Sequence, residues 1–408
     1  MTLTVVVFIL VYVGMMLGRL PRLQLDRTGV ALLGAIVLVA AGMLPLDDAV
    51  TAVDIGTVAL LFALMVVSAQ LRLGGFYTRV TRAVTTLELS PRALLGALVA
   101  VVGLLSAVFS NDVICLAVAP VLLEACVRKG LDPVPFLLAL ACAANAGSAA
   151  TLIGNPQNML VGQALDLSFS AYLLSAVPVC VAGLAATWAI IAWQTDGHWE
   201  AGHDVPAEVT IRTPAFNRWQ TTKGLLVVAG LLYAFLFEPW PRELVALAGA
   251  GVLLMSRKLH SRDMLALVDW QLLVLFAGLF VVNAAFQRTD LPRDVVEALE
   301  RTGVDVAHPV WLFALTVGLS NAVSNVPAVM LLLPFSSHEL SGVILALAST
   351  FAGNLLIVGS IANIIVVDAA ARGGVTIDWR RHARTGVPVT VATLAIAGLA
   401  LWLQPKLH

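Results

Sequence analysis

The chain has 408 residues, of which 60% are hydrophobic and only 12% are charged. A soluble domain carries about 25% charged residues, so this composition excludes a soluble globular protein and predicts an all-α polytopic membrane protein in a lipid bilayer. The formal net charge is −1. No basic cluster is interleaved with aromatic residues, so nothing indicates a nucleic-acid partner.

Four cysteines and the first apolar segment bear on cofactors and processing. Cys115, Cys126, Cys142 and Cys180 lie in apolar stretches, with the spacing of neither a zinc site nor a disulfide framework. We interpret them as small buried residues and expect no resident metal or cofactor. The segment from Thr2 to Leu17 has no basic leader and no small-residue cleavage site. We therefore expect a retained membrane helix rather than a signal peptide.

The first half, residues 1–194, contains apolar spans in close succession. Hydropathy predicts spans at about 2–18, 28–45 and 53–71, a basic connection at 72–92, a segment with two apolar arms at 93–127, a polar-centred stretch at 133–165 and a long span at 169–194. The tip between the two arms of 93–127 reads Ser110-Asn111-Asp112. This half therefore combines ordinary spans with two segments that have polar centres.

A polar linker at 195–223 separates the first half from the second, residues 224–408. Its histidines, His198 and His203, are interpreted as part of a solvated loop rather than as metal ligands. The second half has predicted spans at about 224–238, 242–256 and 267–287, a charged stretch at 288–301, a second two-armed segment at 308–335, a polar-centred helix at 340–370 and a final span at 385–403.

The polar-centred stretch of the first half is broken at Gly154-Asn155-Pro156-Gln157-Asn158, with Asn145 and Thr151 ahead of the break. Proline removes a backbone donor and clashes with the preceding turn, so a regular helix cannot pass through. Within a bilayer such a break survives only inside protein or beside a polar cavity, and paired broken helices form the binding sites of many transporters. The alternative is a proline kink with small residues for close helix packing.

The two halves repeat one another, which is stronger evidence than any single motif. Phe62-Ala63 matches Phe276-Ala277, and Ser110-Asn111 matches Ser324-Asn325 between two apolar arms. The break at 154–158 matches Gly359-Ser360-Ile361-Ala362-Asn363 in the same order along the chain. We therefore predict two structural repeats, 1–194 and 224–408.

Lysine and arginine placement predicts the orientation of each half. In the first half these residues fall in 19–27, 72–92 and 128–129, so these loops are expected to be cytoplasmic. That places the amino terminus outside and the 195–223 linker inside, and it makes 93–127 a re-entrant hairpin. Each half then has five crossings and one hairpin, and because five is odd the two repeats are inverted. The basic bias is weaker in the second half.

This topology brings four polar segments, 110–112, 154–158, 324–326 and 359–363, together near the membrane centre. Helix amino termini at the breaks present amide donors and a positive dipole end, which suit an anion. Unwound carbonyl groups suit a cation such as sodium. A polytopic enzyme would need a nucleophile with a base, a histidine pair for a metal, or paired aspartates, and none of these patterns occurs. A channel is the third possibility, but inverted repeats with broken helices favour alternating access.

The doubled Ser-Asn tips and the two break motifs resemble those of the ion transporter superfamily, over nearly the whole chain. This superfamily includes arsenite and antimonite permeases, citrate and divalent-anion symporters, and sodium/proton antiporters. The stretch from Asn145 to Asn158 is similar to a bacterial subgroup described as anion permeases. The resemblance implies a scaffold with a transport domain, a homodimer, and a multi-pass protein of the bacterial-type inner (plasma) membrane.

The chain departs from the carboxylate symporters of the superfamily at the hairpin tips. Those symporters carry Ser-Asn-Thr, whereas Asp112 and Val326 occupy the third positions here. A carboxylate at a tip would repel a carboxylate substrate, and Asn111-Asp112 is closer to the arsenite permeases. An acid at bilayer depth costs about 2.5–3.5 kcal/mol and is functional by default. Asp112 is interpreted as a proton carrier or a cation ligand, with helix capping as the alternative.

The sequence therefore predicts a secondary active transporter, not an enzyme, for a small anion or oxyacid such as arsenite or silicic acid. A di- or tricarboxylate symporter and a sodium/proton antiporter are the alternatives, and the coupling ion is a proton or sodium. A possible sodium site lies at Ser110, Asn111, Gly154 and Asn158. The predicted binding residues are Ser110, Asn111, Asp112, Asn145, Thr151, Gly154, Asn155, Pro156, Asn158, Ser324, Asn325, Gly359, Ser360 and Asn363.

Overall fold

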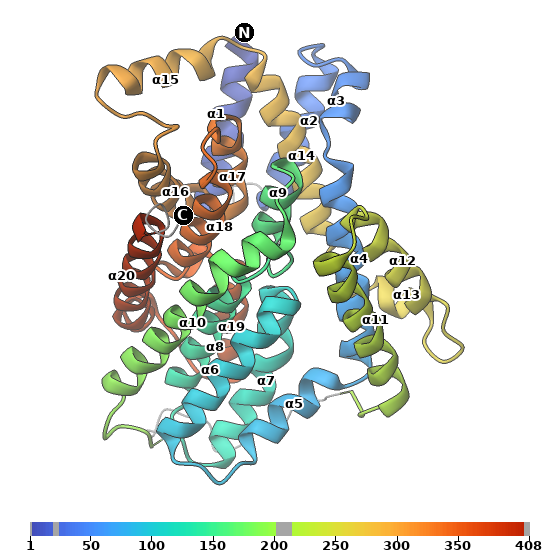
Figure 1. Cartoon of the computed structure of the whole chain (residues 1–408), viewed down its shortest axis with the longest axis vertical. Helices are drawn as coiled ribbons and strands as arrows, with labels where there is room; N and C mark the ends of the chain where they lie inside the picture. Colours follow the sequence, from blue (N-terminus) through green and yellow to red (C-terminus); the bar gives the residue numbers. More distant parts are fainter. Residues whose placement is uncertain (1, 19–23, 201–213, 404–408) are drawn as a thin grey trace.

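The computed structural model describes residues 2–18, 24–200 and 214–403, and this part of the chain is nearly all helical (Figure 1). The first half contains α1 (Thr2–Leu17), α2 (Arg27–Ala40), α3 (Leu46–Ala52), α4 (Ile55–Leu73), α5 (Phe76–Thr85), α6 (Pro91–Val108), α7 (Asn111–Arg128), α8 (Pro133–Ser148), α9 (Pro156–Ala164) and α10 (Phe169–Gln194). The predicted spans and the two polar-centred segments of this half correspond to these helices in order.

The second half contains α11 (Arg218–Phe237), α12 (Arg242–Leu254), α13 (Ser261–Leu265), α14 (Trp270–Gln287), α15 (Leu291–Arg301), α16 (Pro309–Val323), α17 (Asn325–Leu332) with the short 3₁₀ helix η1 (Leu333–Phe335), α18 (Ser341–Ala352), η2 (Ile357–Gly359), α19 (Ile361–Arg372) and α20 (Trp379–Leu403). Within the described ranges, six helices are long and apolar enough to cross a membrane: α4, α6, α10, α11, α14 and α20. The fold is therefore that of a multi-pass membrane protein.

Helices α1–α10 and α11–α20 follow each other in the same order, and most matched pairs have similar lengths, although α7 has 18 residues and α17 has 8. Helix α4 has 19 residues and α14 has 18, and α10 and α20 have 26 and 25. An aspartate caps the amino terminus of both helices in the matched pair α4 and α14. The side chains of Asp54 and Asp269 each accept a hydrogen bond at 2.9 Å from the backbone N–H three residues later. The two halves are thus built from one pattern of helices.

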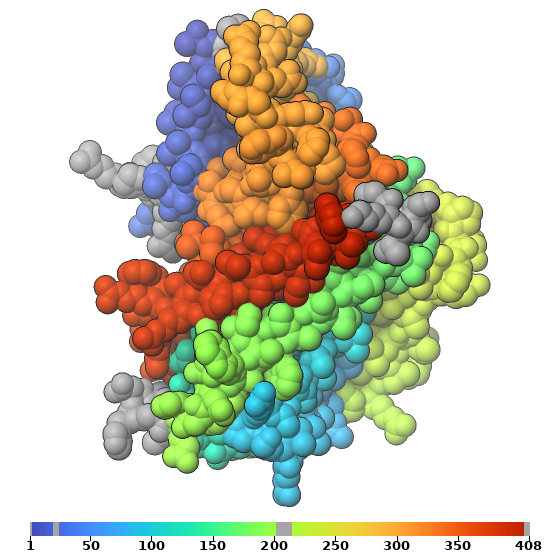
Figure 2. Space-filling model, turned by 60° about the vertical axis from the view of Figure 1, so that its left-hand side comes forward, coloured from blue at the N-terminus to red at the C-terminus, as the bar shows by residue number. Residues whose placement is uncertain are grey.

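Contacts between the halves are reciprocal. Helix α2 packs against α14, and its counterpart α12 packs against α4. Helix α7 packs against α19, while α17 contacts α9, and α10 lies beside its own counterpart α20. Figure 2 shows α10 and α20 as two neighbouring bands that run diagonally across one face. Reciprocal contacts of this kind are expected when two repeats face each other. The direction of each repeat relative to a bilayer remains a prediction.

Each half contains a pair of helices joined by a very short tip. Helices α6 and α7 have 18 residues each and are joined by Phe109 and Ser110. Helices α16 and α17 are joined by Ser324 alone, whose φ is +78°. Non-glycine residues rarely adopt this region, at a cost of about 1–3 kcal/mol, and such strain occurs mostly at functional positions. The two-armed segments predicted at 93–127 and 308–335 therefore form tight hairpins.

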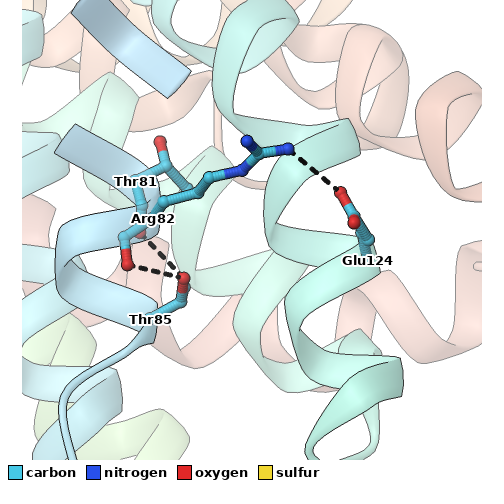
Figure 3. A network of polar contacts seen from close by, with 4 residues as sticks. All are labelled: Thr81, Arg82, Thr85 and Glu124. Carbon is cyan, nitrogen blue, oxygen red and sulfur yellow. Dashed lines mark hydrogen bonds and ion pairs between the residues drawn. The ribbon is translucent and has the colours of Figure 1, made fainter. Parts of the chain in front are cut away.

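The basic connection predicted at 72–92 contains helix α5, which is fixed to the first hairpin. The guanidinium of Arg82 lies 3.8 Å from the Glu124 carboxylate on α7, and the Thr85 hydroxyl donates to the carbonyl of Thr81 one turn earlier (Figure 3). Its counterpart α15 has no buried residue. Helix α5 is thus attached to the first hairpin by an ion pair, whereas α15 buries no residue against its surroundings.

The predicted linker at 195–223 falls partly outside the described residues, which stop at Glu200 and resume at Pro214. Its beginning lies against the turn between α7 and α8, because the Asp132 amide donates to the Trp199 carbonyl at 2.9 Å and Leu131 forms a β-bridge with Glu200. The start of the linker and the outer end of the first hairpin therefore lie on the same side of the molecule.

Helices α6 and α8 approach each other closely where two glycines meet. A Cβ atom on Gly147 would overlap the backbone of Gly103. Backbone atoms cannot move aside as a flexible side chain would. Overpacking of this kind costs about 1–3 kcal/mol. The contact holds α6, the first arm of the first hairpin, against α8, the helix that ends at the first break.

We expect Gly147→Ala to lower the midpoint of thermal unfolding in detergent, because the added methyl group pushes α6 away from α8. Gly230→Ala is the matched control, since a Cβ on Gly230 meets no atom within 4 Å. That substitution should leave the midpoint unchanged or raise it, because alanine favours helix more than glycine does. Equal midpoints for the two variants would show that the α6–α8 contact does not constrain the fold.

Candidate substrate site at the two helix breaks

The first break separates α8, which ends at Ser148, from α9, which begins at Pro156. Proline suits the first helical position because it lacks an N–H and its φ is already helical. The Asn155 side chain accepts a hydrogen bond from the Asn158 amide at 2.8 Å and caps α9. A Cβ on Gly154 would overlap the Ser148 backbone, so only glycine allows the chain to fold back this tightly. The sequence therefore specifies both the break and the new helix.

The Asn158 side chain ties the two sides of the first break together. Its Nδ2 donates to the Thr151 carbonyl at 2.9 Å and to the Tyr172 hydroxyl at 3.1 Å. The Thr151 hydroxyl in turn donates to the carbonyl of Ala107, at the end of α6. Carbonyl groups freed by the break are thus bonded within the protein, as a break in a bilayer requires.

The second break has polar side chains at matched positions in similar roles. Helix α18 ends at Ala352 and α19 begins at Ile361, with Ser360 capping the Ala362 amide at 3.2 Å. The Nδ2 of Asn363 donates to the carbonyls of Gly353 and Leu356 at 2.8 and 3.0 Å. Asn363 therefore bridges its break as Asn158 bridges the first one.

Asn145 joins the first half to the second break. Its Nδ2 donates to Asn354 Oδ1 at 2.7 Å and to Asn363 Oδ1 at 3.3 Å. Its Oδ1 accepts from Asn111 Nδ2 and from the Ser360 hydroxyl, both at 3.0 Å. The side chain is only 1% exposed. One amide thus connects the first hairpin tip, the end of α18 and the start of α19.

Thr350 is the counterpart of Asn145 and connects the second half to the first break. Its hydroxyl accepts hydrogen bonds from Asn155 Nδ2 and from Gln157 Nε2, each at 3.2 Å. Each break is therefore bonded to the long helix of the other repeat. Neither break can change shape without disturbing a polar contact with the opposite half.

The hairpin tips face these breaks. The Asn111 amide donates to the Gly154 carbonyl at 3.1 Å. In the second half, Asn325 lies beside the break, since a Cβ on Gly353 would be 3.1 Å from Asn325 Nδ2. Ser110 and Ser324 are half-buried, whereas the amide side chains of the site are buried. The accessible surface of the site is therefore at the two hairpin tips.

Asp112 is the acidic residue of the first hairpin tip. It lies in the first turn of α7, where the helix dipole favours a negative charge. The residue is half-buried, and its carboxylate forms no hydrogen bond or ion pair with any residue that the structure describes. It does not cap α7 by a side-chain bond, so capping does not account for the residue. Its carboxylate is left available for a proton or a cation.

Several buried amide oxygens of the site lack hydrogen-bond partners in the described part of the chain. They are the Oδ1 atoms of Asn111, Asn158, Asn321 and Asn325. An unpaired buried acceptor costs about 1–3 kcal/mol, so each is expected to find a donor or a cation during function. Asn111 and Asn158 belong to the predicted sodium set, and their free oxygens are suitable ligands for a hard cation.

Hydrogen bonds connect several of the predicted binding residues, among them Asn111, Asn145, Asn155, Asn158, Ser360 and Asn363, and they also involve residues that the sequence did not identify. Thr350 stands where the repeat places Asn145, so the repeat alignment could have revealed it. Arg27 was missed because it lies at the start of α2, far in sequence from any motif. Its guanidinium donates to the Val358 carbonyl at 3.4 Å. The added residues are Arg27, Tyr172, Asn321, Thr350, Asn354 and His382.

Comparison with known structures and sequences fits this architecture. The Alcanivorax borkumensis YdaH transporter matches the fold with a TM-score of 0.60 at 16% identity, over 99% of this chain and 97% of that one. The two chains therefore share a fold. The family model described as CitMHS, citrate transporter, matches residues 8–341. The chain belongs to this family.

Two relatives extend nearly the full length of the chain. A 46 kDa membrane protein of Mycobacterium leprae is 30% identical over 93% of this chain and 94% of its own length. A silicon efflux transporter of Oryza sativa subsp. japonica is 28% identical, covering 92% of each chain. The similarity therefore includes both halves, both hairpins and both breaks.

We expect Asn145→Ala and Asn354→Ala each to lower the midpoint of thermal unfolding, because each leaves a buried polar partner without its hydrogen bond, at about 1–3 kcal/mol. The double variant should lose less than the sum of the two single losses, since both remove the same 2.7 Å bond. Strict additivity would contradict the central role given to Asn145.

Proposed function

We propose that the chain is a secondary active transporter of a small oxyacid or oxyanion, with arsenite and silicic acid as examples. The observation that carries this proposal is the chemistry of the site. It consists of neutral amides and hydroxyls from both breaks, together with one unpaired carboxylate at Asp112. Such a set can exchange hydrogen bonds with O–H groups but cannot balance two negative charges.

A neutral or weakly charged oxyacid suits the free oxygens of the site. Its O–H groups are donors for Asn111 Oδ1, Asn158 Oδ1 and Asn325 Oδ1, which are buried without partners in the described chain. Desolvating a neutral solute also costs much less than desolvating a dianion. The name of the rice relative, a silicon efflux transporter, supports the same class of substrate.

The transport mechanism that we propose is alternating access at the membrane centre. The reciprocal helix contacts support two repeats of inverted orientation, each with one re-entrant hairpin, in the bacterial inner membrane. The hydrogen bonds of Asn145 and Thr350 link each break to the opposite repeat. Movement of one break is thereby coupled to the other, as alternating access requires.

Coupling is assigned to Asp112. A carboxylate without a partner can bind a proton on one side of the membrane and release it on the other. Sodium is the alternative coupling ion, with the free oxygens of Asn111 and Asn158 as further ligands beside Ser110 and Gly154. The two versions differ in whether transport follows the pH gradient or the sodium gradient.

A di- or tricarboxylate symporter is the second candidate, and Arg27 is the observation that favours it. Its guanidinium reaches the Val358 carbonyl beside the second break, so a cation lies close to the amides of the site. Guanidinium groups bind carboxylates in a bidentate manner. The description of the family, citrate transporter, fits this candidate.

Proteoliposomes loaded with arsenite, silicic acid, succinate or citrate, under imposed proton or sodium gradients, distinguish the candidates. We expect saturable transport of an oxyacid that persists in Arg27→Gln. Transport of succinate or citrate that is lost in Arg27→Gln, and lost less in Arg27→Lys, would instead establish the carboxylate symporter. Flux that does not saturate and that neither the proton gradient nor the sodium gradient drives would indicate a channel.

We expect Asp112→Asn to abolish accumulation against a gradient while exchange of substrate at equal concentrations continues. The amide keeps the shape and polarity of the side chain but cannot change its charge between the two access states. Asn158→Ala and Asn363→Ala are the contrasting variants, since they should weaken exchange and accumulation together. Accumulation at the wild-type level in Asp112→Asn would exclude this residue from coupling.

A further inference from the structure

His382 is a buried histidine near the start of α20, 2% exposed, that the proposed cycle does not yet use. Its Nε2 lies 3.1 Å from the Asn354 carbonyl. A carbonyl oxygen can only accept, so Nε2 carries a hydrogen in either charge state of the ring. The other ring nitrogen, Nδ1, is buried and has no hydrogen-bond partner among the described residues. In the neutral ring this atom is a free acceptor.

Tyr172 in the first half is the counterpart of His382, and a tyrosine does not titrate near neutral pH. Asn158 and Asn363 donate to the carbonyls of Ser148 and Gly353 in their respective breaks. The next carbonyls, those of Ala149 and Asn354, accept from Tyr172 Oη at 2.7 Å and from His382 Nε2. Tyr172 and His382 thus hold equivalent carbonyls from α10 and α20, and only the histidine ordinarily titrates between pH 5 and 8.

The Asn354 carbonyl that His382 holds belongs to a residue of the site. The side-chain Oδ1 of Asn354 accepts from Asn145 Nδ2 at 2.7 Å, and Asn145 also contacts Asn111, Ser360 and Asn363. Close approach of α20 makes this possible, since a Cβ on Gly386 would overlap the Asn354 carbonyl. A change of charge on His382 therefore acts two hydrogen bonds away from Asn145.

Water has a route toward the same end of α20. A cavity of about 590 Å³ is lined by Asp132, Gln194, Arg381, Arg384 and Thr385, among other residues. Three of these residues lie within three positions of His382 on its own helix. The cavity therefore brings solvent, and with it protons, close to the buried ring.

The ionisable groups around His382 are few. Helices α8, α10 and α18 pack against α20. Helix α18 carries no ionisable side chain, and Arg380, Arg381 and Arg384 on α20 are exposed. The remaining ionisable groups of the packed elements are Asp132 and Cys142 with α8, and Tyr172 and Cys180 on α10. No ion pair fixes the charge of His382 within the described chain.

We propose that His382 is a second ionisable residue of the transport site, which takes up a proton at Nδ1 and transmits its charge through Asn354 to Asn145. A proton from water adds to the Nδ1 lone pair and gives the imidazolium, and the reverse step returns it to water. The Nε2–H bond to Asn354 persists in both states. This proposal rests on the proposed transport function. It also means that the two halves differ at matched positions, since the second half has an ionisable histidine where the first has Tyr172.

Substrate exchange measured in proteoliposomes between pH 5 and 8 tests the transport part. In the Asp112→Asn background, where exchange continues and Asp112 cannot titrate, the rate should depend on pH. Adding His382→Tyr should make the rate nearly independent of pH, because tyrosine repeats the Tyr172 arrangement without titrating in this range. His382→Phe should lose exchange by about ten-fold or more at every pH, since it leaves the Asn354 carbonyl without a donor. An unchanged pH profile after His382→Tyr in the Asp112→Asn background would overturn the proposal.

Nitrogen-15 NMR of histidine-labelled protein in detergent tests proton binding without any transport assay. The resonances present in the wild type and absent from His382→Tyr identify His382. We expect them to titrate between pH 5 and 8, with the proton on Nε2 at high pH. Resonances that do not move over this range would overturn the proposal, whichever solute is transported. Titrating resonances in a protein that moves none of the tested solutes would overturn the proposed transport function and support proton binding at His382.

Discussion

The structure depends on how two helices are interrupted inside an apolar protein without leaving their backbone groups unpaired. Water is absent from the bilayer core, so each freed carbonyl must find a donor within the chain. Asn158 and Asn363 supply these donors to carbonyls within their breaks. The caps from Asn155 and Ser360 then start the new helices. Both breaks are therefore stable features, held by side chains at matched positions.

Satisfying the breaks also connects the two repeats. Asn145 of α8 bonds to Ser360 and Asn363 of the second half, while Thr350 of α18 accepts from Asn155 and Gln157 of the first. Buried polar networks of this kind strengthen when every member is satisfied and are costly when one is lost. The same bonds that stabilise the breaks thus also join the two halves, which links stability to the mechanism that we propose.

The chemistry of the site comes from departures from the repeat rather than from the repeat itself. Asp112 stands where the second half has Val326, and His382 holds a carbonyl where the first half uses Tyr172. The hairpins differ as well, because α5 pairs with α7 through Arg82 and Glu124, whereas α15 has no buried residue. Matched positions build the frame, and in the mechanism that we propose the unmatched positions give each half a different response to protons.

The sequence by itself determined the helical class, the order of the spans, the repeat and both breaks, because hydropathy, proline and glycine act locally and at fixed spacing. It also identified Asn145, Asn158 and Asn363 as polar residues in apolar surroundings. Only the tertiary structure decided which residues meet. Arg27 reaches Val358, and His382 reaches Asn354, across distances in sequence that no local pattern encodes. Contacts between helices depend on packing angles and close approaches such as those at Gly147 and Gly386, which exist only once the chain has folded.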